Sequence, residues 1–97
     1  MRLRFTPRSL DNLATIADYL SARDSAAARR VRAAIYRTLR LLISFPQLGR
    51  RQTVEGVRKI VTRRYGYILY YLLDEHADEI VILSVIHPAQ AREHTDI

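Results

Sequence analysis

The chain has 97 residues, of which 48% are hydrophobic, and a formal net charge of +6. This length and composition predict one small domain over residues 1–97 and exclude global disorder, and no apolar run is long enough to span a bilayer. Because the sequence has no cysteine, disulfides and thiolate chemistry are excluded, which is compatible with the reducing cytoplasm where we expect the protein to act.

The first part of the sequence predicts a short strand followed by a helix. Residues 2–5 alternate polar and apolar side chains, as a strand does. Thr6 and Pro7 mark a helix start, since threonine caps helices well and proline fits the first helical position. This helix should run to about residue 20, with an apolar face made of Leu10, Leu13, Ala17 and Leu20 and with Ile16 beside it.

A second helix carries the clearest pattern in the sequence. Asp24 or Ser25 caps it, and Phe45 and Pro46 end it. One face should be buried and the other should present guanidinium groups, so the two helices form an antiparallel hairpin. The buried stripe is Val31, Ile35, Thr38, Leu39 and Leu42, and the arginines on the opposite side and flanks are Arg29, Arg30, Arg32, Arg37 and Arg40.

The second half predicts a loop and three strands. Residues 45–51 contain proline and glycine and read as a loop. Strands are expected over residues 57–63, 67–73 and 79–87, and the last two are so apolar that they should be central in the sheet or covered by a partner. The predicted fold class is therefore α+β, a helical hairpin packed on a mainly antiparallel sheet, in the order β-α-α-β-β-β.

Charge is distributed very unevenly along the chain. Residues 25–64 contain eleven bases and one acid, whereas residues 65–97 contain six acids and one base. All the bases except Lys59 are arginine, whose planar group pairs with carboxylates and phosphates in a bidentate manner. The middle of the chain therefore predicts an anionic partner, either a nucleic acid or an acidic protein segment.

Several short motifs follow one another at characteristic positions. They are Tyr19, Phe45-Pro46-Gln47-Leu48-Gly49-Arg50, Val57-Arg58-Lys59-Ile60-Val61, Arg64-Tyr65, Ile68-Leu69-Tyr70-Tyr71 and Ile82-Leu83-Ser84-Val85-Ile86-His87. Together with the order of elements, they resemble the ParE/RelE superfamily of toxins from bacterial type II toxin–antitoxin systems. The resemblance implies a small basic toxin that is neutralised by an acidic, partly disordered, ParD-like antitoxin. It also implies one of two targets, DNA gyrase for ParE-like members or mRNA on the ribosome for RelE-like members.

The choice between these targets rests on what a nuclease needs. Metal-free RNA cleavage requires a base, an acid and cations around the phosphate. Here residues 92–97 contain no tyrosine, and no basic residue other than His76 and His87 occurs between Tyr65 and Ala91, where RelE-like nucleases place a catalytic arginine. We therefore expect a ParE-like gyrase inhibitor. The alternatives are a RelE-like ribosome-dependent mRNA interferase, acting as a metal-independent endoribonuclease, and a non-toxic nucleic-acid-binding domain.

These functional hypotheses predict which residues form the binding or catalytic sites. The predicted antitoxin-binding residues are Arg29, Arg32, Tyr36, Arg37 and Arg40, and the predicted target-binding residues are Arg50, Arg51, Arg58, Arg63, Arg64, His87 and Arg92. If the chain is a ribonuclease, the catalytic residues are Lys59, Arg63, Arg64 and His87. The arginines could instead only solvate the surface, and Tyr65, Tyr67, Tyr70 and Tyr71 are expected to pack in the core rather than stack on bases. No cofactor or metal is expected, because the histidines lack metal-ligand spacing.

Overall fold

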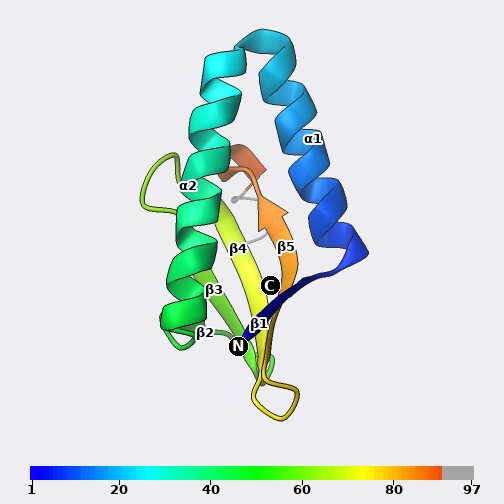
Figure 1. Cartoon of the computed structure of the whole chain (residues 1–97). Coiled ribbons are helices and arrows are strands. Elements are labelled where there is room, and N and C mark those ends of the chain that lie inside the picture. Colours follow the sequence, from blue (N-terminus) through cyan, green and yellow to red (C-terminus); the bar gives the residue numbers. More distant parts are fainter. Residues whose placement is uncertain (91–97) are drawn as a thin grey trace.

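The computed structural model describes residues 1–90. Within them lie, in order, β1 (Arg2–Phe5), α1 (Pro7–Arg23), α2 (Ser25–Ser44), β2 (Arg50–Arg51), β3 (Val57–Val61), β4 (Ile68–Asp74) and β5 (Glu79–Ile86). The two helices join at one end, diverge toward the other, and cover one face of the sheet (Figure 1). This arrangement confirms the predicted α+β class. No helix in residues 1–90 is both long and apolar enough to cross a membrane.

The sheet has the order β1-β5-β4-β3-β2. β1 runs parallel to β5, and every other neighbouring pair is antiparallel. The prediction that the last two strands are central is confirmed, because β4 and β5 each lie between two other strands. The sequence did not predict β2, since a two-residue strand is too short to show alternation. The predicted strand over residues 57–63 was wrong at its end, where Thr62 begins a tight turn after Val61.

Both predicted helix starts are confirmed by side-chain caps. The Thr6 hydroxyl accepts a hydrogen bond from the Ser9 N–H at 3.1 Å, with Pro7 in the first turn. Asp24 accepts from the N–H groups of Ala26 and Ala27 at 3.0 and 3.2 Å. Each cap satisfies amide groups that have no partner inside the helix, which fixes where the helix begins.

The core contains the whole predicted stripe of α2, because Val31, Ile35, Thr38, Leu39 and Leu42 are all buried. The face predicted for α1 was partly wrong. Leu13, Ile16 and Leu20 do pack against the core, but Leu10 is 53% exposed and Ala17 is exposed as well. The reason is that polar groups occupy the inward side of the first turns: Ser9 is buried, and Asn12 accepts a hydrogen bond from the Val85 N–H at 3.0 Å. These contacts fix the rotation of α1 about its axis.

A β-bulge interrupts the pairing of β5 with β4. Tyr70 pairs with Ser84 and Tyr71 pairs with Ile82, so Leu83 is an extra residue without a partner in β4. Thr6 donates its hydroxyl to the carbonyls of Ile82 and Leu83, at 3.1 and 3.0 Å, and so binds the bulge to the start of α1. The extra residue puts Ile80, Ile82 and Val85 on the helix-covered side.

The tyrosines confirm the packing prediction with one exception. Tyr67, Tyr70 and Tyr71 are 2%, 4% and 0% exposed, and Tyr70 belongs to a smaller cluster with Ile68 and Ile86 that is separate from the main core. Tyr65 contradicts the prediction, because it is 43% exposed. It lies in the turn that follows β3 rather than in a strand, so the sheet does not cover its ring.

Candidate partner-binding surface

The outer surface of α2 separates two grooves. The α1–α2 groove lies between the helices, where Figure 1 shows the two arms diverging, and has a volume of about 550 Å³. Its wall is largely apolar, with Phe5, Leu10 and Leu13 among the side chains that line it. The charged residues in its lining are Arg29 and Arg32, and no acidic side chain among the described residues contributes. An apolar channel with cationic borders suits an acidic amphipathic segment.

The predicted antitoxin-binding residues divide between the sides of α2. Arg29, Arg32 and Tyr36 come together in the α1–α2 groove, where the Arg32 guanidinium carbon lies 5.3 Å from the centre of the Tyr36 ring. Tyr36 is 48% exposed despite its size, so a partner can bury it. Arg37 lines the other side of α2, and Arg40 is exposed and lines neither groove.

The second groove, the α2–β3 groove, has a volume of about 540 Å³. It lies between α2, β3 and the turn at residues 62–66. Apolar and basic residues line it, namely Arg30, Ala33, Ala34, Arg37, Thr38, Leu41, Leu48, Ile60, Val61, Arg63, Arg64 and Tyr65. The structure thus brings Arg37 close to Arg63 and Arg64, two residues that the sequence assigned to the target.

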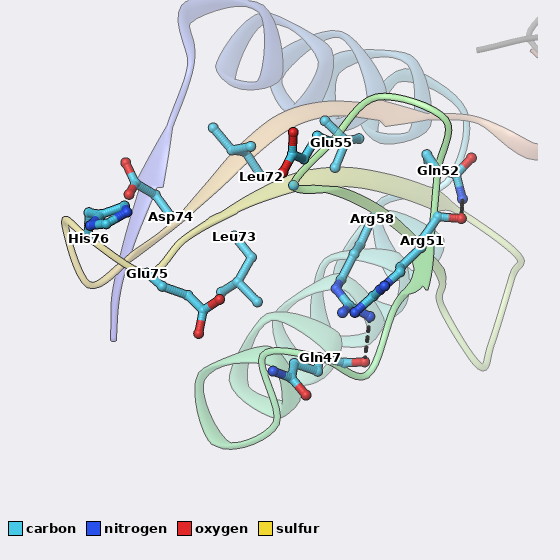
Figure 2. A pocket seen from close by; sticks show the side chains of 12 residues that line it. Gln47, Arg51, Gln52, Glu55, Arg58, Leu72, Leu73, Asp74, Glu75 and His76 are labelled. Atoms are coloured by element: carbon cyan, nitrogen blue, oxygen red, sulfur yellow. Dashed lines mark hydrogen bonds between the residues drawn. The ribbon is translucent and has the colours of Figure 1, made fainter.

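Hydrogen bonds from Tyr71 and Arg58 fix the loop between α2 and β2. The Tyr71 hydroxyl donates to the Pro46 carbonyl at 2.7 Å and accepts from the Gly49 N–H at 2.9 Å. Arg58 donates to the carbonyls of Gln47 and Gly49, at 3.0 and 2.8 Å, and Figure 2 shows the bond to Gln47. Arg58 is half-buried, and its Nη1 holds the loop in place through these two hydrogen bonds.

The Tyr71 hydroxyl yields a prediction about alkaline pH. Burial raises the pKa of Tyr71 above its ordinary value of 10.0, while the Gly49 N–H and the Arg58 charge oppose this shift more weakly. The unfolded chain then releases the Tyr71 proton at a lower pH than the folded chain does. We expect the free energy of unfolding to be independent of this group below pH 10 and to fall as the pH rises above it.

The matched variant is Tyr71→Phe, measured by urea unfolding at a series of pH values. At neutral pH the free energy of unfolding of this variant should be about 1–3 kcal/mol lower than that of the parent, because the Gly49 N–H and the Pro46 carbonyl lose their hydrogen-bond partner. Above pH 10 the gap between the parent and the variant should narrow. A gap that stays constant up to strongly alkaline pH would show that Tyr71 titrates as it does in the unfolded chain.

A third pocket, of about 600 Å³, lies at the end of the sheet near the β4–β5 turn. Figure 2 shows Arg51 and Arg58 at the Gln47 end of this pocket, and the acidic side chains of Asp74 and Glu75 at the other end. Opposite charges share the pocket, so it favours neither anions nor cations strongly. Within residues 1–90, no group of three or more His, Asp or Glu side chains is placed to hold a metal ion.

The predicted target-binding residues form two groups. Arg50 and Arg51 in β2 lie opposite Lys59 and Arg58 of β3. At the other end of the sheet, Arg63 and Arg64 occupy the turn after β3, and His87 follows the last residue of β5. Arg92 lies outside the described residues.

His87 is close to the second group. The Thr62 N–H bonds the Tyr67 carbonyl at 2.7 Å, and the Tyr67 ring meets the His87 ring edge-on with 5.3 Å between centroids. His87 Nδ1 accepts a hydrogen bond from the Ala89 N–H at 2.9 Å, so Nε2 is the ring nitrogen left for a ligand. Of the four residues proposed for a ribonuclease, the structure gathers Arg63, Arg64 and His87 at one end of the sheet, while Lys59 lies within β3.

Comparison with known proteins shows which family this chain resembles. Residues 3–92 match the family described as ParE toxin of type II toxin–antitoxin system, parDE. A search of curated proteins gave no match. Among solved structures, a chain from the chromosomal ParDE toxin–antitoxin system of P. aeruginosa is 22% identical with a TM-score of 0.74, over 90% of this chain and 95% of that chain.

Two structures from E. coli share the fold at lower identity. A chain of the intact RelBE toxin–antitoxin complex is 18% identical with a TM-score of 0.64, over 89% of this chain and 94% of that chain. A mutant of the toxin RelE in the free state is 16% identical with a TM-score of 0.65, over 98% of this chain and 90% of that chain. The family match covers nearly the entire chain, so this protein belongs to the ParE toxin family of type II toxin–antitoxin systems.

Proposed function

We propose that this toxin stops growth by acting on DNA gyrase. The observation that carries the proposal is the composition of the two central strands. β4 and β5 contain no Lys, Arg or His, so these two strands offer no cation to a phosphate in an RNA-cleaving transition state, and Lys59 of the neighbouring β3, paired with Tyr70, is a basic residue next to them. An inhibitor that works by binding needs no such group there, since an interface distributes its energy over several residues. The basic residues at the two ends of β3 are the proposed contacts with gyrase.

We further propose that an acidic, ParD-like antitoxin neutralises the toxin and binds in the α1–α2 groove. Arg29 and Arg32 border this groove and Tyr36 lies in its wall. A disordered acidic segment can fold onto such a surface as an amphipathic helix. The similar P. aeruginosa chain belongs to a ParDE system and the similar E. coli chain to a RelBE complex, which supports a toxin–antitoxin hetero-oligomer here.

The alternative is a RelE-like ribosome-dependent mRNA interferase. The observation in its favour is that Arg63, Arg64 and His87 lie at the same end of the sheet. His87 would act through Nε2, because Nδ1 is engaged by the Ala89 N–H. Membership of the toxin family favours either of these functions over a generic nucleic-acid-binding domain.

Expression of the toxin alone in cells separates the two functions. Both proposed targets, gyrase and the ribosome, are in the cytoplasm, where we expect the toxin to act. Poisoned gyrase should give filamentous cells and a DNA-damage response, whereas mRNA cleavage should stop translation first. Under the gyrase function, His87→Ala should weaken toxicity only gradually. Under the nuclease function the same change should reduce cleavage by orders of magnitude, because it removes a group that acts on the transition state.

A further inference from the structure

The loop between α2 and β2, residues 45–49, exposes two large apolar side chains. Phe45 is 60% exposed and Leu48 is 53% exposed, and no other Phe or Tyr in residues 1–90 is as exposed as Phe45. Both side chains line a hollow of about 440 Å³, together with Met1 and Leu73. The loop lies at the end of α2 that is far from its junction with α1 (Figure 1). Neighbouring exposed apolar side chains, unlike scattered ones, are typical of a surface that a partner covers.

Hydrogen bonds hold the backbone of this loop in one conformation. The Phe45 N–H donates to the Leu41 carbonyl at 2.7 Å, and the Leu48 N–H donates to the Phe45 carbonyl at 3.0 Å. Tyr71 and Arg58 fix the rest of the loop, as described above. A partner therefore does not have to order this backbone, which lowers the entropic cost of binding. A rigid surface of this kind suits the folded surface of another protein, whereas a disordered segment binds in a groove.

The charged residues next to the loop repel one another across β2 and β3. Arg50 lies opposite Lys59, and Arg51 lies opposite Arg58. Like charges that lie directly opposite each other destabilise a pair of strands. The ion pairs within residues 1–90 all lie around β1, at the other edge of the sheet, and none involves Arg50 or Arg51. Carboxylates of a partner would offset this repulsion, so the charge beside the loop favours an acidic surface.

Two other kinds of partner fit these residues less well. A nucleic acid would pair its phosphates with Arg50 and Arg51, but it has no counterpart for Leu48, and the Glu75 carboxylate in the lining of the hollow would repel phosphates. A second copy of this chain, which has a net charge of +6, would bring two sets of the same arginines together across a shared axis. Another protein can place apolar side chains in the hollow and carboxylates at the arginines.

We propose that the loop surface, made of Phe45, Leu48, Arg50 and Arg51, anchors this toxin on an acidic surface of gyrase. This inference rests on the proposed gyrase function and deepens it, because basic residues alone give charge attraction whereas Phe45 and Leu48 supply apolar anchors. Phe45 fills an apolar pocket of the target, and the two arginines pair with carboxylates at its border. Tyr71 acts indirectly, since it holds the loop in the conformation that binds.

The first test compares variants of the full chain in a gyrase supercoiling assay. Phe45→Ala/Leu48→Ala removes the two apolar anchors. Its control, Tyr19→Ala/Ile43→Ala, also removes one aromatic and one aliphatic side chain, which are 51% and 42% exposed on α1 and α2. We expect the first pair to raise the concentration for half-inhibition by about tenfold or more, and the control pair by about twofold at most. Both pairs should keep a melting temperature close to that of the parent, because all four side chains are exposed.

Arg50→Glu/Arg51→Glu separates a role in binding from a role in folding. The change turns both like-charge pairs with β3 into opposite-charge pairs, so its melting temperature should equal or exceed that of the parent. Inhibition of gyrase should nevertheless weaken by about tenfold or more. The control, Arg8→Glu/Arg30→Glu, makes the same change in net charge at two exposed arginines of the helices and should stay within about twofold of the parent. Equal losses from the two pairs would overturn the proposal, because net charge alone would then explain them.

The remaining outcomes distinguish the inference from the function on which it rests. If the parent inhibits gyrase and Phe45→Ala/Leu48→Ala inhibits it equally well, the loop surface is not the contact and the gyrase function stands. If that variant instead loses affinity only for the antitoxin, the surface belongs to the antitoxin and the inference is wrong. If it loses affinity for a double-stranded DNA oligonucleotide and keeps its affinity for DNA-free gyrase, the surface binds nucleic acid and the inference is wrong. If the parent does not inhibit gyrase, the proposed function fails together with the inference.

Discussion

Replacing Leu42 with alanine should lower the free energy of unfolding by about 2–5 kcal/mol, the usual effect of emptying a large core position. Leu42 is 0% exposed and lies in the buried stripe that joins α2 to the sheet. A domain of this size holds only about 5–15 kcal/mol in total, so the change removes a large share of its stability. Urea unfolding followed by far-UV circular dichroism measures the difference directly.

Leu41→Ala is the matched control, because Leu41 is the neighbouring leucine of the same helix and is 43% exposed. Its effect on unfolding should be well below that of Leu42→Ala. Equal losses from the two substitutions would contradict the assignment of the buried face of α2.

Gly49→Ala should lower the free energy of unfolding nearly as much as Leu42→Ala does, although it adds only one methyl group. A Cβ at this position would lie 2.6 Å from the Tyr71 hydroxyl oxygen and 3.0 Å from the Lys59 carbonyl oxygen. Tyr71 is fully buried and cannot swing away, so its hydrogen bonds to the loop must distort. Overpacking combined with disturbed hydrogen bonds predicts a loss of about 2–4 kcal/mol, measured again by urea unfolding.

Gln47→Ala in the same loop serves as the comparison. Gln47 contributes its backbone carbonyl to Arg58, and alanine keeps that carbonyl. Its exposed side chain can therefore be removed with little change in stability. If Gly49→Ala were as harmless as Gln47→Ala, the close approach of Tyr71 to the loop would not exist in solution.

Much of the fold was predictable because its signals are local. The caps at Thr6 and Asp24 and the stripe of α2 depend on residues within a few positions of one another, and all are confirmed. The rotation of α1 was not predictable, because it depends on the hydrogen bond between Asn12 and Val85, which are far apart in sequence. The bulge at Leu83 is also invisible to an alternation count, since one extra residue only makes the strand look more apolar.

The candidate surface also divides into features that follow from local sequence and features that only the fold determines. The sequence predicted that α2 presents its arginines to solvent, because helical periodicity fixes their faces, and the arginines of α2 are exposed in the structure. It did not separate Arg37 from Arg32, since only the fold shows that one faces β3 and the other faces α1. It assigned Arg58 to the target and did not predict its hydrogen bonds to loop carbonyls, which come from residues nine and eleven positions away.

The most direct test of the proposed target is a comparison of two assays on one preparation of purified toxin. We predict that it inhibits DNA supercoiling by gyrase, that adding the antitoxin reverses the inhibition, and that it leaves ribosome-bound mRNA intact. The absence of cations from β4 and β5 is the physical reason for the second half of this prediction. Cleavage of ribosome-bound mRNA that His87→Ala abolishes, together with unimpaired gyrase, would contradict the proposed target and establish the ribonuclease function.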